Sequence, residues 1–197
     1  MTNTTFKFGH LVCAYHNDGI MVLGVTNTGI KDLTIPNLIN EHTVTAIGPN
    51  AFRNCFNLTY VTLPNTLIYI NKYAFANCVS LQTIIIPDSV LYMGEGVFST
   101  CTKLLHVTLS NQLGCISSGM FVNCCNLDNV LIPDSVKSIR EYAFSGCTKL
   151  NKFNISVTTT DIHPDTFGHC YTLKYLTIVS SFETTRVLVD NYFNTIA

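Results

Sequence analysis

The sequence lacks the features that would place it in a membrane, on nucleic acid or in the secretory pathway. No apolar run reaches the roughly 18 residues of a membrane span, although 47% of the 197 residues are hydrophobic, so we expect no membrane insertion. Only 12% are charged, the net charge is −1 and basic runs are absent, so we expect no nucleic-acid partner. The start, Met1–Phe8, does not resemble a secretory signal. The protein is therefore intracellular, or its signal was removed or lies outside this sequence.

The residue patterns of common catalytic and metal sites are also missing. The nine cysteines include no C-x-x-C pair, which excludes zinc-ribbon spacing. The glycines form no phosphate-binding loop, and no nucleophile motif supports a catalytic triad. The six histidines share no spacing that would bring three to one metal: His10, His16, His42, His106, His163 and His169. We expect no cofactor, no metal and no enzymatic activity.

What the sequence does contain is a repeat of 23 residues in six copies. Four columns hold this spacing throughout. The phenylalanine column is Phe52, Phe75, Phe98, Phe121, Phe144 and Phe167. The cysteine column is Cys55, Cys78, Cys101, Cys124, Cys147 and Cys170. A leucine column runs from Leu58 to Leu173, and an apolar column runs from Ile47 to Ile162. A period of this length is typical of a solenoid, in which each coil packs on its neighbours.

Each unit has three parts. Leu58 to Leu63 alternates so that Val61 points inward and its neighbours point outward, as in a half-buried strand. A Pro-Asn or Pro-Asp turn ends the strand, except at Ser110 and Ser156, where we expect local loop changes. An extended return and a short helical or 3₁₀ turn near Phe75 follow. The fold class is therefore a mostly β solenoid of the α/β type. Its parallel sheet of about seven strands would be about 30 Å wide.

Both ends depart from the repeat. Residues 6–25 read as a β-hairpin that caps the first coil, with its turn at Asp18-Gly19. About five residues are inserted around Leu38–His42. Beyond Ile178 the register slips by about three residues. We therefore divide the chain into an N-terminal cap with the first strand (1–46), a repeat array (47–179), and a degenerate C-terminal cap or truncated repeat (180–197).

The repeat resembles a known family. Leu58-x-x-Val61-x-Leu63 with the apolar residues that follow is similar to a leucine-rich repeat, and the segment from Ile70 to Val90 resembles the BspA-like subfamily in particular. The resemblance implies a right-handed superhelix with its sheet on the concave face, and a binding scaffold rather than a catalyst. It suggests a cell surface, whereas the missing signal and the free thiols favour the cell interior, so the sequence leaves the location open.

The fixed columns are interpreted as core. Cysteine is a small hydrophobe that is usually buried. Thiols on adjacent coils would lie about 5 Å apart, but they would point in parallel into the interior rather than at each other. Cys125 is the thiol we expect to be most exposed, while Cys13 and Cys115 are undecided. The phenylalanine rings would fill the other side of each coil.

The positions that vary lie on the outer face of the strands. They form two columns. One is Tyr60, Thr83, His106, Asn129, Lys152 and Tyr175, and the other is Thr62, Ile85, Thr108, Leu131, Asn154 and Thr177. Tyrosine is enriched at contact surfaces, and outward Ile85 and Leu131 are unusual on a solvated strand.

We therefore predict a module for protein binding or adhesion that uses a protein ligand, with contact residues Tyr60, Thr62, Ile85, His106, Asn129, Leu131, Lys152, Asn154 and Tyr175. The alternative is a structural spacer or a fragment of a longer array without its own ligand. We expect a monomer, although the sequence leaves the oligomeric state open.

Overall fold

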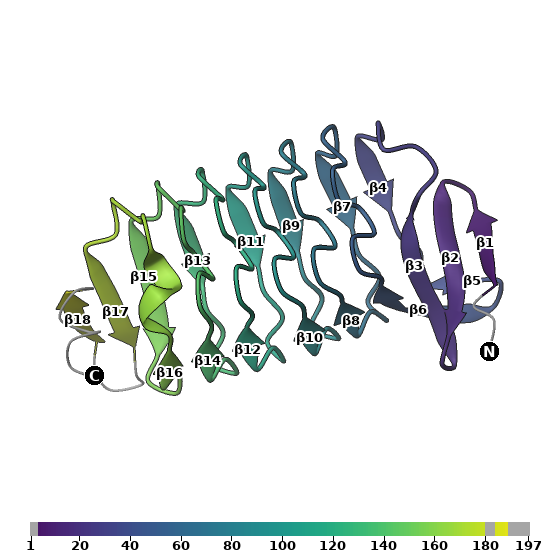
Figure 1. Ribbon diagram of the computed structural model, residues 1–197. Coiled ribbons are helices and arrows are strands. Elements are labelled where there is room, and N and C mark those ends of the chain that lie inside the picture. The colour runs from purple at the N-terminus through teal and green to yellow at the C-terminus, as the bar shows by residue number, and fades with distance from the viewer. Residues whose placement is uncertain (1–3, 180–183, 189–197) are drawn as a thin grey trace.

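The computed structural model describes residues 4–179 and 184–188 and forms a β-solenoid of stacked coils. Figure 1 shows the coils side by side in one row, with the capping strands at the two ends. The predicted repeat fold is thus confirmed. The described residues contain strands and turns but no α-helix, and one 3₁₀ helix, η1 (Pro164–Phe167).

One strand of each coil belongs to the main ladder, whose residues alternate between core and solvent. The seven parallel strands predicted from the sequence are all present. They are β4 (Asp32–Thr34), β7 (Tyr60–Thr62), β9 (Thr83–Ile85), β11 (His106–Thr108), β13 (Asn129–Leu131), β15 (Lys152–Ser156) and β17 (Tyr175–Val179). Their hydrogen bonds divide them into three groups, β4-β7, β9-β11 and β13-β15-β17, rather than one continuous sheet.

The extended return of each coil forms a second ladder of short strands. These strands are β6 (His42–Ile47), β8 (Tyr69–Ile70), β10 (Tyr92–Met93), β12 (Cys115–Ile116), β14 (Ser138–Ile139) and β16 (Asp161–Ile162). Each two-residue strand places a buried apolar side chain inward at its second position, as at Ile70. The first residue is exposed at Tyr69, whereas Ser138 of β14 is buried. The sequence pattern predicted an extended segment here but not its pairing.

The N-terminal cap is the predicted hairpin with one further strand. β2 (Leu11–His16) pairs antiparallel with β3 (Gly19–Val25), and β1 (Thr5–Phe8) pairs with β2. The hairpin loop consists of Asn17 and Asp18, because Gly19 already belongs to β3. β3 continues parallel to β6, so the cap extends the second ladder and not the main one.

The insertion near residue 40 is a second small hairpin. β5 (Leu38–Ile39) pairs antiparallel with β6 across a two-residue turn. Both turn residues, Asn40 and Glu41, have positive φ angles of 49° and 64°, as a type I′ turn requires. At the other end, β18 (Thr184–Leu188) pairs antiparallel with β17. The rest of the predicted C-terminal unit, 180–183 and 189–197, lies outside the described residues.

The turns that follow the strands keep one geometry even where proline is missing. The amide of the third residue after Pro64, Pro87 or Pro133 donates to the carbonyl of that proline. The amide of Leu113 donates to Ser110 in the same way, at 3.2 Å. The Ser110 hydroxyl also donates to the Val90 carbonyl (2.7 Å) and accepts from the Gln112 amide (3.1 Å). The loop change expected at this serine is therefore absent.

Candidate functional site

The outward columns of the main ladder lie where the alternation predicts. Tyr60, His106, Asn129, Lys152 and Tyr175 are exposed. Thr62, Ile85 and Leu131 are also exposed, whereas Asn154 is half-buried. The two most exposed large apolar side chains of this face are Ile85 (68%) and Leu131 (70%). We call these two columns together the strand face.

The parallel register aligns the candidates in rows but does not gather them at one point. Asn129 lies beside Lys152, and Leu131 lies beside Asn154. Tyr60 and Tyr175 are five coils apart, which corresponds to about 24 Å at the usual strand spacing. A single small molecule cannot touch both. A partner that uses the whole strand face must therefore be extended across the coils.

Part of the strand face is hollowed between β7 and β9. The hollow has a volume of about 350 Å³, and Tyr60, Thr62 and Ile85 of the predicted set line it. Val61, Asn65 and Pro87 also line it and were not predicted as contact residues. Val61 occupies the inward column, whose members Ile84, Val107 and Val130 are buried, yet it is only half-buried.

The hollow coincides with a loose junction between two strand groups. β7 and β9 belong to different hydrogen-bonded groups. The Gln82 amide lies 3.5 Å from the Thr59 carbonyl, whereas the equivalent bonds are 2.7 Å from Thr59 to Lys31 and 2.8 Å from Leu105 to Gln82. The size of Val61 does not explain the opening, because Val107 and Val130 are the same residue type and are buried. The sequence therefore does not mark the opening locally.

The cysteine column is a structural ladder rather than a reactive site. Each thiol from the second coil onward donates to the carbonyl of the phenylalanine 26 residues earlier, at 3.0–3.2 Å. Cys78 to Phe52 and Cys101 to Phe75 are the first two of these contacts. Cysteine therefore offers both a small apolar volume and a weak donor at this position. All nine cysteines are free.

Burial makes the ladder thiols poor nucleophiles. Desolvation raises the pKa of the Cys101 thiol to about 12 and that of Cys170 to about 11. It also raises the pKa of Cys124 and Cys147, with neighbouring thiols adding a smaller repulsion. Because the thiolate is the reactive form, these groups are inert at neutral pH. Cys13 is buried, and Cys115 and Cys125 are half-buried.

The phenylalanine column forms a continuous stack through the core. Ring centroids of successive members are 5.1–5.9 Å apart with interplanar angles of 15–22°. Phe153, the inward residue of β15, packs edge-on against both Phe144 and Phe167 at 4.8 Å. This assignment of the column to the core is as predicted.

Within residues 4–179 and 184–188, no group of three or more His, Cys, Asp or Glu side chains could hold a metal ion. Nor does that part of the chain contain a helix long and apolar enough to cross a membrane.

Stacked 23-residue coils, a parallel ladder of short strands and ladders of buried Leu, Phe and Cys define a leucine-rich repeat solenoid. The model of the BspA type leucine rich repeat region matches residues 26–135 and 116–194, with six copies. The chain therefore belongs to the BspA-type leucine-rich repeat family. No curated protein sequence matches it significantly.

Solved structures from bacteria share the fold. The Treponema pallidum leucine-rich repeat protein TpLRR superimposes with a TM-score of 0.72 at 24% identity, covering 86% of this chain and 91% of that one. A leucine-rich repeat protein from Eubacterium ventriosum gives a TM-score of 0.65 at 18% identity, covering 92% and 50%. The pneumococcal vaccine antigen PcpA gives 0.54 at 15%, covering 90% and 50%. At these identities the likeness concerns the fold alone.

Proposed function

We propose that the protein is a non-catalytic module that binds an extended segment of a partner protein across the strand face. The observation that carries the proposal is the hollow between β7 and β9, which exposes Tyr60 and Ile85 beside the half-buried Val61. Tyrosine is enriched among the residues that carry binding energy at protein contacts, and binding hollows are lined mainly by apolar and aromatic side chains. Repeat scaffolds commonly bind through such continuous surfaces.

The remaining strand face supplies polar positions around this anchor. His106, Asn129 and Lys152 follow in successive coils of the same column, and Tyr175 ends it. Such side chains can specify a partner without contributing much affinity. The family to which the chain belongs consists of repeat proteins, which supports a scaffold rather than an enzyme.

Affinity capture with a matched control tests the proposal. The wild-type protein, a strand-face variant (Tyr60→Ala/Lys152→Glu/Tyr175→Ala) and a control variant would be used to capture proteins from lysate or matrix. The control, Tyr69→Ala/Tyr92→Ala/Lys137→Glu, makes the same three exchanges at exposed positions of the return side. We expect the first variant to lose partners that the control retains.

Circular dichroism and the unfolding midpoint show whether both variants are folded. If the strand-face variant folds and still captures every partner, the strand face is not the binding surface. The second candidate function, a structural spacer, then gains support. It is favoured by the structures from Eubacterium ventriosum and PcpA, of which this chain covers 50%, since similar coils occur there within longer chains. A reading frame that continues with further repeats past Ala197 would strengthen it.

A further inference from the structure

A second hollow lies away from the strand face, where the return strands lead into the turns. It has a volume of about 390 Å³. The rings of Tyr73 and Tyr142 stand at its two ends, three coils apart, and Gly96 and Gly119 lie between them in the same repeat position. Glu95 and Glu141 line it as well.

The hollow lies along one backbone column that has left-handed geometry, in which Gly96 and Gly119 carry no side chains. Its members Asn50, Tyr73, Gly96, Gly119 and Tyr142 have φ angles of 56–59°. Glycine and asparagine tolerate this region, whereas tyrosine adopts it at a cost. A Cβ atom at Gly96 would overlap the Cε1 and Cδ1 atoms of Tyr73, so glycine lets that ring lie across its coil. A Cβ atom at Gly119 would meet nothing closer than 3.7 Å and would project into the hollow.

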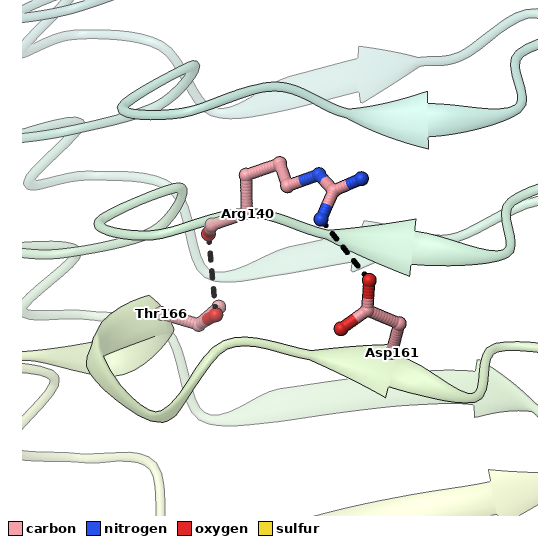
Figure 2. A network of polar contacts seen from close by, with 3 residues as sticks. All are labelled: Arg140, Asp161 and Thr166. Carbon is pink, nitrogen blue, oxygen red and sulfur yellow. Dashed lines mark hydrogen bonds and ion pairs between the residues drawn. The ribbon is translucent and has the colours of Figure 1, made fainter.

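The charge of the hollow is negative and not internally compensated. Within the described residues, Glu95 and Glu141 form no ion pair. Arg140 precedes Glu141 but extends to the following coil, where its Nη1 donates to Asp161 Oδ2 at 3.1 Å, as Figure 2 shows. Lys72, one coil before Glu95 in the same column, is exposed and likewise unpaired within that described part.

One of the two tyrosines already binds a guanidinium group. The Arg53 Cζ atom lies 5.7 Å from the centroid of the Tyr73 ring, within the range of a cation–π contact. Arg53 approaches from the preceding coil, whereas Gly96 and the hollow belong to the following coils. Tyr142 has no such arginine among the described residues.

We propose that the hollow between Tyr73 and Tyr142 binds a guanidinium group, such as an arginine side chain of a partner. Aromatic rings and two carboxylates around a shallow depression complement a planar cation, which can stack on a ring while it donates to the acids. This site is separate from the strand face, and its occupancy does not depend on the function proposed for that face.

The test is an NMR titration that follows the backbone amides of Gly96 and Gly119. The probe is N-acetyl-arginine amide, and N-acetyl-citrulline amide is its neutral isostere. We expect saturable shifts with the arginine probe and none with citrulline. Glu141→Gln and Tyr142→Asn should each weaken binding about three- to fivefold, the effect of losing one exposed cation contact.

Two further variants keep the result decisive. Gly119→Asn fills the open space while retaining a residue that the column accepts at Asn50, so we expect a folded protein that no longer binds the probe. Tyr175→Ala on the strand face should bind as the wild type does. Equal shifts with citrulline, or unchanged affinity in the folded Gly119→Asn variant, would overturn the proposal.

Discussion

Within one strand of the main ladder, neighbouring residues serve opposite purposes. In β9, Ile84 is 2% exposed and Ile85 is 68% exposed, although they are the same residue type. The inward columns repeat because each coil must fit the next, and the Phe rings and the Cys–carbonyl contacts form ladders that run from coil to coil along the array. The outward columns carry no such constraint, so their variation can encode recognition. The repeat therefore assigns packing to the inward residues and leaves the outward residues free for the recognition proposed above.

The largest expected change in stability comes from removing one ring from the phenylalanine stack. Phe121 is fully buried, and its centroid lies 5.6 Å from Phe98 and 5.2 Å from Phe144. We expect Phe121→Ala to lower the free energy of unfolding by about 3–5 kcal/mol, because it removes a buried aromatic side chain and leaves a cavity. Urea denaturation measures the change. Phe56→Ala is the control, since Phe56 is half exposed (51%) and should change stability by less than about 0.5 kcal/mol. An unchanged melting temperature for Phe121→Ala would contradict the assigned core.

The most direct test compares the two isoleucines of β9. Ile84→Ala should cost about 2–5 kcal/mol, the range for truncating a buried aliphatic side chain, whereas Ile85→Ala should cost less than about 0.5 kcal/mol. Both changes remove the same atoms from the same strand, so backbone propensity cancels. Chemical denaturation of the pair gives the difference. Similar losses for both variants would mean that the two side chains are equally buried, and a larger loss for Ile85→Ala would mean that the strand alternates in the opposite sense.

The cysteine ladder predicts a loss of stability at alkaline pH. Burial raises the pKa of Cys101 to about 12 and also raises that of Cys124, above a value of 9.0 for the unfolded chain. At a pH above the pKa of the unfolded chain, the unfolded state binds fewer protons than the folded state, so the free energy of unfolding falls as pH rises. The stability that the buried thiols contribute is complete only below that pH. Each thiol contributes a slope of up to about 1.4 kcal/mol per pH unit.

A single substitution isolates this contribution. We expect Cys124→Ala to be less stable than the wild type at pH 7 but to lose less stability between pH 9 and pH 10.5. Denaturation curves at four pH values give the two slopes. Cys125→Ala is the matched control, because Cys125 is adjacent in sequence but only half-buried. If Cys124→Ala and the wild type fall in parallel, the buried thiol does not govern the alkaline transition.

The fold could be predicted from sequence because it rests on fixed columns. Phe75, Cys78 and Leu81 repeat at one spacing, and the alternation in Val61-Thr62-Leu63 assigns each side chain to a face. The position of each residue in the repeat was enough to predict that Ile85 is exposed and that Ile84 is buried. The stacked rings follow from the same spacing, since equivalent atoms of adjacent coils must lie about one strand apart.

The features that escaped prediction depend on small differences between coils. The hollow on the strand face lies beside a long hydrogen bond between Gln82 and Thr59, at 3.5 Å, which no residue type marks. The hairpin of β5 and β6 was visible only as extra length, although Asn40 at a positive φ angle is a usual turn residue. The hollow near Gly119 needed the backbone angles, because its glycines lie outside any known motif.

The smallest expected change in stability concerns the residue before each ladder cysteine, because the backbone at this position has a left-handed conformation. Asn54, Asn77 and Asn123 have φ angles of 60–64°, and Thr100 adopts 61° at the same position. A β-branched residue is strained there, whereas asparagine tolerates the left-handed region. We therefore expect Thr100→Asn to raise the free energy of unfolding by about 0.5–1 kcal/mol, and the reciprocal Asn123→Thr to lower it by a similar amount. Thermal unfolding of the two variants and of the double swap measures both changes. The double swap leaves the amino-acid composition unchanged. If its stability matches the wild type while the single variants change in opposite directions, backbone conformation rather than side-chain contacts selects asparagine in this column. A loss of stability in Thr100→Asn would instead mean that the Thr100 hydroxyl stabilises the fold through its contact with Ser99 Oγ, which lies 3.5 Å away.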